Sequence, residues 1–498
     1  MNIENLINKL SSNSHEINSE IKTTYQCDDT QAKEYIKLYL ELCQNFKLHF
    51  PESKEITIVR APGRVNLIGE HTDYNSLPVL PIAIEKNVVC ISSVNSDSIV
   101  RLYNHDTNFE YREFDINKHK YPYKQGDWGN YVKAGLFWLE TENKKGFNAL
   151  FYGNIPIASG LSSSSALVVA SALSFLEANK INFDKKELAE QLAKAEQYVG
   201  TMSGGMDHAI SLLGKEGTAL KIDFHPLSVE TVTIPDSISF VVANSMIRAA
   251  KTENAKLKYN RRAIESRLIT AFINKFVSKE FDTRNDFLYI GSLKKEYPDK
   301  NTPAVDYLLN NVLNKDSFTI IEIADSLEIS AKELKEKYLR IEEGHHEDSF
   351  FREPSDGFKL QQRFKYIVNE SNRVDEAVKA MVSGNIKYFG ELMNLSHKDA
   401  RNLYEISIPD LDLLCNLSYA NGALGARLTG AGFGGCIISV IGNKKVSKVI
   451  DILTKQYFNA YFKQKHPKLY SGNYWNTTDK IFACKPCKGA GLLFSDYL

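Results

Sequence analysis

The chain has 498 residues, and its 61 Lys and Arg residues are balanced by 61 Asp and Glu residues. The length favours two or more domains, and the zero formal net charge argues against a surface built for nucleic acid or an anionic membrane. Seven cysteines scattered along the chain indicate reduced thiols, and no run of 18 apolar residues is present to span a bilayer. We therefore expect a cytoplasmic protein that binds neither nucleic acid nor membrane.

The N-terminal part of the chain changes character near residue 25. Residues 1–24 are polar, and we expect them to form a flexible or weakly helical extension. Apolar side chains then recur at helical spacing over residues 31–50, and Pro51 ends that helix. A strand is predicted over residues 55–61.

Residues 60–75, here called the polar segment, read RAPGRVNLIGEHTDYN. A guanidinium group, an amide, two carboxylates and an imidazole lie within ten residues of this segment. Carboxylates accept hydrogen bonds from hydroxyl groups and guanidinium groups donate them, so this mixture favours a polyhydroxylated ligand. Two other interpretations stay open at this point: a metal site made by Glu70, His71 and Asp73, and a solvated loop.

Two aromatic residues, Trp128 and Tyr131, open the helix predicted over residues 131–140. Their rings are suited to sandwiching a flat ligand, although packing in the core is the commoner role of Trp and Tyr.

Residues 153–165, here called the serine loop, read GNIPIASGLSSSS and lead into an apolar helix that extends to about residue 178. A helix start leaves N–H donors unpaired, and small residues let the backbone approach a ligand closely. One serine would be enough to cap the helix, so four serines after a glycine favour a phosphate-binding site over a simple polar turn.

A third candidate site lies around residue 200. Asp184 and Glu187 form a capping box for a helix that carries Glu196 near its end. Residues 201–208, TMSGGMDH, then place Asp207 after two glycines at the start of another helix. The helix dipole favours an ionised carboxylate there, which suits Asp207 to accept a proton, while ordinary helix capping is the alternative.

The C-terminal half contains a charged, mainly helical region at 260–350 and then a run of glycines. Residues 430–435, GAGFGG, here called the glycine loop, contain a G-x-G-x-x-G match. An apolar strand follows at 437–441, whereas a dinucleotide fingerprint should open a helix. The pattern therefore indicates a loop that brings the backbone close to a phosphate or a sugar.

Taken together, these segments resemble the GHMP small-molecule kinases and, within them, the galactokinase family. APGRVNLIGEHTDYN is similar to the galactokinase signature, GNIPIASGLSSSSA to the phosphate loop, and LTGAGFGGC to the third GHMP motif. The resemblance covers roughly residues 50–498. It implies an α+β, two-lobed GHMP kinase fold, in which an N-terminal lobe like domain 2 of ribosomal protein S5 and a ferredoxin-like α/β C-terminal lobe flank the active site. On this chain the lobes are expected at 25–240 and 241–498, with a helical insert at about 265–350.

The resemblance also implies roles for single residues. Asp207 is the expected base for the sugar 1-hydroxyl, and Arg64 is expected to hold Asp207 and to steady the transferring phosphoryl group. Ser164 and Glu196 match a Mg²⁺-binding pair. Ala250 stands where the eukaryotic branch usually has Asn. The other implied contacts are, for the sugar, Arg64, Glu70, His71, Asp73, Gly204, Asp207 and Tyr259, and, for ATP, Trp128, Tyr131, Gly160, Ser162, Ser163, Ser164, Ser165 and Lys251.

The activity implied by the resemblance is ATP-dependent phosphorylation of galactose at its anomeric 1-hydroxyl, with Mg²⁺, by a monomer that acts on small molecules. Two alternatives stay open. One is an N-acetylgalactosamine kinase, which needs room for a 2-acetamido group. The other is a transcriptional sensor that binds galactose and ATP; such sensors lack part of the Ser-Ala run that this chain keeps at Ser165 and Ala166, which favours the enzyme.

Overall fold

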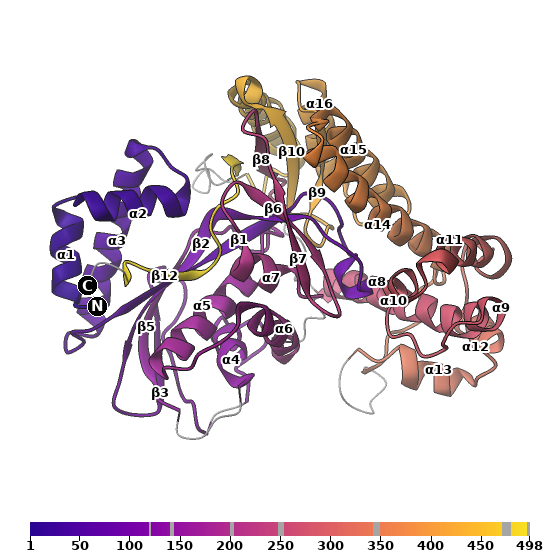
Figure 1. Cartoon of the computed structure of the whole chain (residues 1–498), viewed down its shortest axis with the longest axis horizontal. Coiled ribbons are helices and arrows are strands. Elements are labelled where there is room, and N and C mark those ends of the chain that lie inside the picture. The colour runs from indigo at the N-terminus through magenta and orange to yellow at the C-terminus, as the bar shows by residue number, and fades with distance from the viewer. Residues whose placement is uncertain are drawn as a thin grey trace.

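The backbone forms two lobes, each built on its own sheet with helices packed against it (Figure 1). The computed structural model describes residues 1–118, 121–139, 144–199, 204–247, 253–341, 349–470 and 480–495. Along these ranges no helix is both long enough and apolar enough to cross a membrane.

The first lobe contains a six-stranded sheet among the described residues. Its strands are β1 (Thr57–Asn66), β2 (Pro81–Val94), β3 (Ile99–Asn104), β4 (Arg112–Asp115), β5 (Phe147–Gly153) and β12 (Gly491–Leu493). They lie in the order β12-β1-β2-β5-β3-β4, and only the β3–β5 pair is parallel among these neighbours. The register of β1 against β2 shifts between Pro62 and Arg64, and such a bulge redirects the side chains that follow it.

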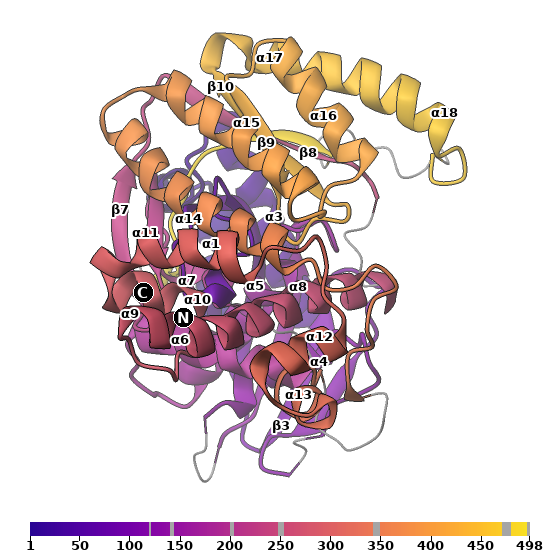
Figure 2. The ribbon, with the colours of Figure 1, turned by 90° about the vertical axis from the view of Figure 1, so that its right-hand side faces the viewer.

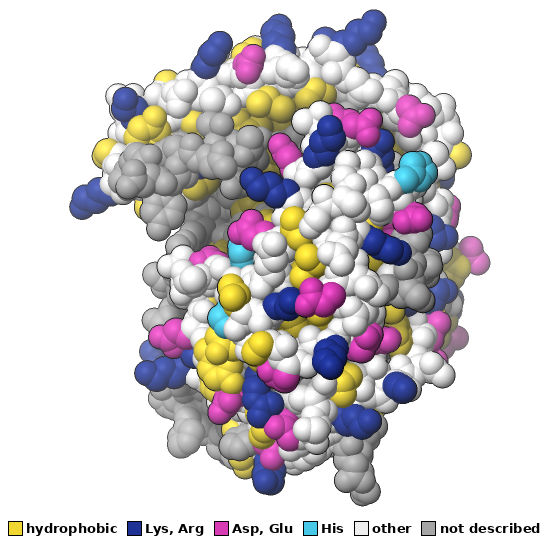
Figure 3. Space-filling model, turned by 90° about the vertical axis from the view of Figure 1, so that its left-hand side faces the viewer, with side chains coloured by type: hydrophobic (Ala, Val, Ile, Leu, Met, Phe, Trp, Pro, Cys, Tyr) yellow, Lys and Arg dark blue, Asp and Glu magenta, His cyan; other side chains and the backbone are white. Residues whose placement is uncertain are grey.

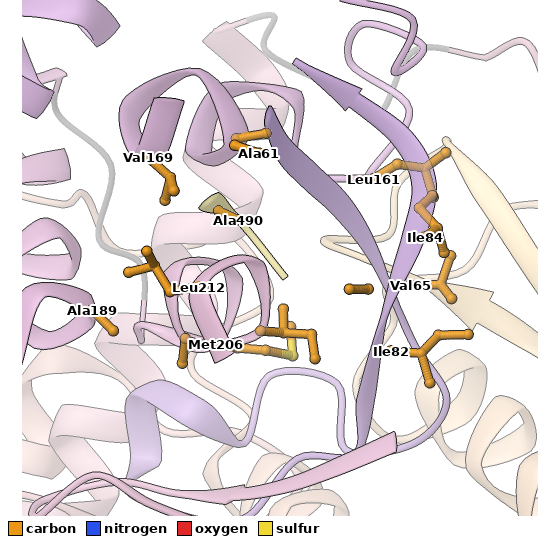
Figure 4. Packing of buried hydrophobic residues seen from close by; sticks show 14 of the residues in the cluster. Ala61, Val65, Ile82, Ile84, Leu161, Val169, Ala189, Met206, Leu212 and Ala490 are labelled. Carbon is orange, nitrogen blue, oxygen red and sulfur yellow. The ribbon is translucent and has the colours of Figure 1, made fainter. Parts of the chain in front are cut away.

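Helices cover one face of this sheet. They are α4 (Gly129–Phe137), α5 (Ser163–Ala178), α6 (Lys185–Ala195), the 3₁₀ turn η2 (Glu196–Val199) and α7 (Met206–Leu213). Helix α5 is apolar around its circumference because it lies between the sheet and the other helices. Figure 4 shows part of this core, including Ala61 of β1, Val169 of α5 and Leu212 of α7. The serine loop and α7 are therefore anchored on one rigid layer.

The N-terminal residues correct the expectation of a flexible extension. Residues 1–24 fall in α1 (Ile3–Ser11) and α2 (His15–Tyr25), which pack with α3 (Asp29–His49) on the opposite face of the sheet (Figure 1). Leu6 and Leu10 of α1 and Ile17 and Ile21 of α2 recur at helical spacing and are buried. Their apolar faces meet sheet residues such as Ile58, so burial orders a segment that looks polar on average.

The second lobe has a four-stranded antiparallel sheet in the described part of the chain, in the order β11-β8-β10-β9. These strands are β8 (Ile238–Asn244), β9 (Gly425–Thr429), β10 (Cys436–Gly442) and β11 (Ile481–Cys484). The helices around them are α14 (Leu360–Val382), α15 (Ile386–Asn402), α16 (Pro409–Ala420), η6 (Asn443–Lys445), α17 (Val446–Ile452), η7 (Leu453–Phe462) and α18 (Lys463–Lys465). Figure 2 shows α14 and α15 running side by side.

Two further groups complete the fold. A hairpin joins β6 (Thr218–Asp223) to β7 (Ser228–Thr233). Helix α8 (Glu253–Phe272) runs into the region, about 265–350, in which the helical insert is expected. The helices described in that region are η3 (Ile273–Val277), α9 (Ser278–Phe281), α10 (Ile290–Glu296), α11 (Pro298–Tyr307), η4 (Leu308–Val312), α12 (Ile320–Leu327) and α13 (Ala331–Tyr338).

The boundary between the lobes differs from the expected 240/241 division. That division falls inside β8, which belongs wholly to the second sheet. The chain also returns to the first lobe at its end, where β12 pairs with β1. On the face shown in Figure 3, basic and acidic side chains are interspersed, as the zero net charge leads one to expect.

Candidate active site

Arg64 and Asp207 form the centre of the site. Arg64 follows the bulge in β1, and Asp207 is the second residue of α7. The Nε and Nη2 groups of Arg64 donate to Oδ1 and Oδ2 of Asp207 at 2.7 and 3.0 Å. Burial alone would lower the pKa of Arg64, but the carboxylates of Asp207 and Glu70 outweigh it and raise that pKa. The guanidinium therefore stays charged and holds the carboxylate in one orientation.

The serine loop joins this pair directly. Arg64 Nη1 donates to the carbonyl oxygen of Gly160, and the Ser162 hydroxyl donates to Asp207 Oδ2. Ser162 precedes α5 with a left-handed backbone (φ 62°), and its side chain makes no capping hydrogen bond to the helix. The hydroxyl that commonly caps a helix is thus turned toward the carboxylate, and the first turn of α5 keeps its N–H groups for another acceptor.

Glu196 lies beneath the start of α5, and only 3% of it is exposed. Its Oε1 accepts a hydrogen bond from Ser165 Oγ at 2.8 Å. Ser164, the serine expected to share a cation with Glu196, is half-buried on the same turn. Among the residues that the structure describes, no cluster of three or more His, Cys, Asp or Glu side chains has the arrangement of a metal site.

The polar segment crosses from β1 toward β2 and is held by the second lobe. Glu70 Oε1 accepts from the Gly430 N–H at 2.7 Å, and Arg427 Nη1 lies 3.5 Å away. Burial raises the pKa of Glu70, although the guanidinium groups of Arg427 and Arg64 act to lower it. His71 Nε2 lies 3.1 Å from the Ala431 carbonyl oxygen, and burial lowers the pKa of His71 to about 4.

Asp73, Gly204 and Tyr259 complete the predicted sugar-binding set. Burial and then the charge of Asp207 raise the pKa of Asp73 to about 7. A Cβ atom on Gly204 would lie 2.4 Å from Asp73 Cγ, so only glycine leaves room for this carboxyl group. The Tyr259 ring centroid is 5.3 Å from that of His71. The fold thus brings together residues that lie far apart in the sequence.

The glycine loop packs against the serine loop. Gly430 has φ 88°, and a Cβ there would lie 2.6 Å from the Gly160 carbonyl oxygen. Glycine is required because both a left-handed backbone and this close approach exclude a side chain. The two loops therefore form one wall of the site from two different lobes.

Two of the residues expected to contact adenine, Trp128 and Tyr131, lie at the hydrophobic core of the first lobe. Trp128 is only 7% exposed, packs edge-on against Phe109 and Phe151, and donates from Nε1 to the Glu110 carbonyl oxygen at 3.0 Å. This is the core-packing role that the sequence left open, while Tyr131 is half-buried against the same core. Lys251, and Ala250 before it, lie outside the described residues.

Four residues of this region had not been picked out from the sequence: Tyr366, Glu370, Tyr404 and Arg427. Glu370 Oε1 accepts from the Gly69 N–H at 2.9 Å, and Tyr366 donates to the Glu70 carbonyl oxygen at 3.1 Å. Three of the four lie on or just after helices of the second lobe and have no sequence pattern of their own. Only Arg427, three residues before the glycine loop, carries a signal: a basic residue between Ala426 and Leu428 in a short strand.

The two sheets, the serine loop at a helix start and the glycine loop behind it define a GHMP small-molecule kinase. The descriptions that match are "Galactokinase galactose-binding signature" over 44–94, "GHMP kinases N terminal domain" over 130–215 and "GHMP kinases C terminal" over 377–459. The mevalonate kinase of Methanococcus jannaschii shares the fold, with a TM-score of 0.52 at 18% identity over 87% of this chain and 99% of that one. The predicted fold class is confirmed.

The relatives narrow the class further. A galactokinase of Dictyostelium discoideum is 33% identical over 493 residues, covering 92% of this chain and 94% of the relative. A galactokinase of Saccharomyces cerevisiae is 31% identical, covering 93% and 97%. The structure of Lactococcus lactis galactokinase complexed with galactose matches with a TM-score of 0.70 at 28% identity, over 92% of this chain and 100% of that chain. The chain belongs to the galactokinase family.

Proposed function

We propose that this protein transfers the γ-phosphoryl group of ATP to the anomeric 1-hydroxyl of galactose, giving galactose 1-phosphate and ADP. The observation that carries the proposal is the junction at Asp207. One carboxylate is bonded to Arg64 and to Ser162 of the serine loop, and it lies beside the polar segment. A sugar hydroxyl and a terminal phosphate that bind to these two loops meet at that carboxylate.

Asp207 is the proposed base for the sugar hydroxyl. As the oxygen of the 1-hydroxyl bonds to phosphorus, its proton passes to a carboxylate oxygen of Asp207, and the bond from the γ-phosphorus to the bridging oxygen of ADP breaks. Phosphoryl transfer has a loose transition state, so holding the reactants in line matters more than complete proton removal. Arg64 contributes by fixing the orientation of Asp207 and by placing a positive charge beside the transferring group.

The sugar is proposed to bind along the polar segment. Glu70 and Asp73 supply carboxyl oxygens that accept from sugar hydroxyls, with Gly204 leaving the space and Tyr259 offering an aromatic face. The second lobe already engages Glu70 Oε1, so that oxygen is oriented before the sugar arrives.

The nucleotide is proposed to bind at the serine loop through Gly160 and Ser162 to Ser165. The start of α5 suits phosphate oxygens, and Tyr131 and Lys251 remain candidates for contacts with the rest of ATP, together with the edge of Trp128. A hydroxyl and a carboxylate are ligands that Mg²⁺ accepts while keeping several waters, so Ser164 and Glu196 fit this ion chemically. When bound, Mg²⁺ would neutralise phosphate charge. We further propose a cytoplasmic monomer.

The test is a direct assay of purified protein with ATP and Mg²⁺, comparing galactose with N-acetylgalactosamine and following the anomeric phosphate by ³¹P NMR. We expect a phosphate on C1 of galactose and a much smaller kcat/KM for N-acetylgalactosamine. Faster turnover of N-acetylgalactosamine would transfer the proposal to that sugar. Binding of galactose and ATP with no turnover of either sugar would support a sensor instead.

A further inference from the structure

The second lobe holds the polar segment through five hydrogen bonds. They run from Gly69 to Tyr74 and come from three places: α14, the glycine loop and the turn after α15. The contacts are Gly69 N–H to Glu370 Oε1 (2.9 Å), Tyr366 O–H to the Glu70 carbonyl (3.1 Å), Gly430 N–H to Glu70 Oε1 (2.7 Å), His71 Nε2 to the Ala431 carbonyl (3.1 Å), and the Tyr74 hydroxyl to the Tyr404 hydroxyl (2.8 Å).

The protonation of His71 follows from its partners. A carbonyl oxygen only accepts hydrogen bonds, so the Nε2 atom that faces Ala431 carries the hydrogen. Burial lowers the pKa of His71 to about 4, and the ring is therefore neutral at ordinary pH. A neutral ring has one hydrogen on nitrogen, so Nδ1 is an acceptor. The Tyr74 hydroxyl, 2.9 Å from Nδ1, must donate to it.

The direction of the next hydrogen bond is then settled as well. A phenol has a single hydrogen, and Tyr74 uses its own toward His71. Tyr404 is therefore the donor in the pair between the two hydroxyls. The resulting chain of hydrogen bonds runs from the Tyr404 hydroxyl to the Tyr74 hydroxyl, from there to His71 Nδ1, and from His71 Nε2–H to the Ala431 carbonyl oxygen.

The position of Tyr404, the first donor of this hydrogen-bond chain, is fixed by several contacts. It is fully buried, its ring stacks on Tyr366 with centroids 4.2 Å apart, and Arg262 Nε donates to its carbonyl oxygen at 2.6 Å. Arg262 is bonded in turn to Glu265 on the same helix, α8. Burial raises the pKa of Tyr404 to about 12, so the hydroxyl keeps the hydrogen that it donates.

We propose that Tyr404 is a positioning residue for the sugar: through Tyr74, which donates to Nδ1, it keeps the His71 ring oriented with its Nε2–H on Ala431 and so ties the polar segment to the glycine loop. Both ring nitrogens of His71 are then committed to protein partners. His71 acts by fixing the backbone that carries Glu70 and Asp73, and its ring nitrogens do not bond the sugar. The kinetic consequence rests on the proposed galactokinase activity, whereas the tautomer does not.

The kinetic test compares Tyr404→Phe and Tyr74→Phe with Tyr39→Phe. Tyr39 is a matched control, because its hydroxyl also pairs with a buried tyrosine, Tyr25, at 2.6 Å but lies among the N-terminal helices. Loss of one hydrogen bond should raise KM for galactose about 5-fold in the two site variants and leave KM for ATP within about 2-fold. The control should retain both values. An unchanged KM for galactose in both site variants, with melting temperatures near wild type, would overturn the proposal.

The tautomer test uses ¹⁵N-histidine NMR of the protein without substrates. The His71 ring is identified by the signals that disappear in His71→Gln. Wild type should show protonated Nε2 and unprotonated Nδ1. Tyr74→Phe should keep this tautomer, because the Ala431 carbonyl still accepts from Nε2–H, but its Nδ1 signal should move toward that of an acceptor without a donor, whereas Tyr39→Phe should match wild type. A hydrogen on Nδ1 of wild type, or an Nδ1 signal that does not move in Tyr74→Phe, contradicts the proposal. If wild type fails to phosphorylate galactose, the proposed function fails, while this spectrum still decides the hydrogen-bond chain.

Discussion

Arg64 and Asp207, 143 residues apart in the chain, meet through two parallel hydrogen bonds of 2.7 and 3.0 Å. Both side chains come from rigid elements, β1 and α7, that share one core. The pair fixes the orientation of the carboxylate, and the Ser162 hydroxyl of the serine loop donates to its Oδ2. This arrangement supports a base whose position is determined before any ligand binds.

Asp207→Asn should lower kcat by about 10²- to 10⁴-fold, because an amide keeps the shape but cannot accept the proton. KM for galactose should change much less. Steady-state kinetics would measure both values. Asp97→Asn is the control, since Asp97 forms a similar bidentate ion pair with Arg101 on the surface. A kcat of Asp207→Asn within a few-fold of wild type would end the assignment of the base.

Gly204→Ala should raise KM for galactose and lower kcat/KM by about 10-fold, because overpacking of this kind typically costs 1–3 kcal/mol. The added methyl group would lie 2.4 Å from Asp73 Cγ and displace that carboxyl group. Gly442→Ala is the control, because no atom lies within 4 Å of its added Cβ. Equal kinetic parameters for the two variants would show that Asp73 does not depend on the space at Gly204.

Ser164→Ala and Glu196→Gln should raise the Mg²⁺ concentration needed for half-maximal rate, since each removes an oxygen ligand proposed for the ion. Ser165→Ala separates the two serines, because Ser165 is the one bonded to Glu196. Ser171→Ala, on the same helix with its hydroxyl bonded to the Leu167 carbonyl, is the control. A shift in Ser165→Ala alone would move the ligand role from Ser164 to Ser165. No shift in any of the variants would contradict the placement of the ion.

Asp73 should make the ligand-free protein less stable as the pH rises. Its pKa is raised from 3.8 to about 7, so the folded protein holds a proton that the unfolded chain releases. The resulting stabilisation is complete below about pH 4 and is lost as the pH approaches 7. Between pH 5 and pH 8, the melting temperature of wild type should therefore fall relative to that of Asp73→Asn.

Asp97→Asn controls for this pH effect. Its hydrogen bonds to Arg101 lower the pKa of Asp97, so this carboxylate stays ionised from pH 5 to pH 8. The difference in melting temperature between Asp97→Asn and wild type should then be constant over that range. A constant difference for Asp73→Asn as well would refute the raised pKa of Asp73.

Leu10→Ala should lower the free energy of unfolding by about 2–5 kcal/mol, the usual cost of removing a buried leucine side chain. Leu10 is 1% exposed in the cluster between the N-terminal helices and the sheet. Leu48→Ala, at a position 80% exposed, should change stability by less than about 0.5 kcal/mol. Denaturant titration measures both. Equal stability of the two variants would show that α1 is not packed on the sheet.

Much of the site could be read from contiguous residues. The serine loop, the polar segment and the glycine loop are local patterns, because each is a run of chemically distinctive residues within one short segment. Helix 31–50 was also predicted, since Tyr39 and Phe46 recur on its buried face. The contacts that hold the polar segment were not, because Tyr404 and Glu370 lie some 300 residues further along the chain.

The N-terminal helices illustrate the same limit. Leu6 and Leu10 are spaced as a helix requires, yet short isolated helices are marginal in water, and only a partner surface decides whether they form. That surface is the sheet face around Ile58, which no local pattern in residues 1–24 reveals.

Motifs in the sequence were enough to predict the family and the two-lobed fold, because each motif carries its own local chemistry. The tertiary structure alone decided that Ser165 bonds Glu196, that Trp128 packs in the core and that both nitrogens of His71 are occupied. Hydrogen bonds and packing depend on where side chains meet after folding, and no local pattern in the sequence specifies those meetings.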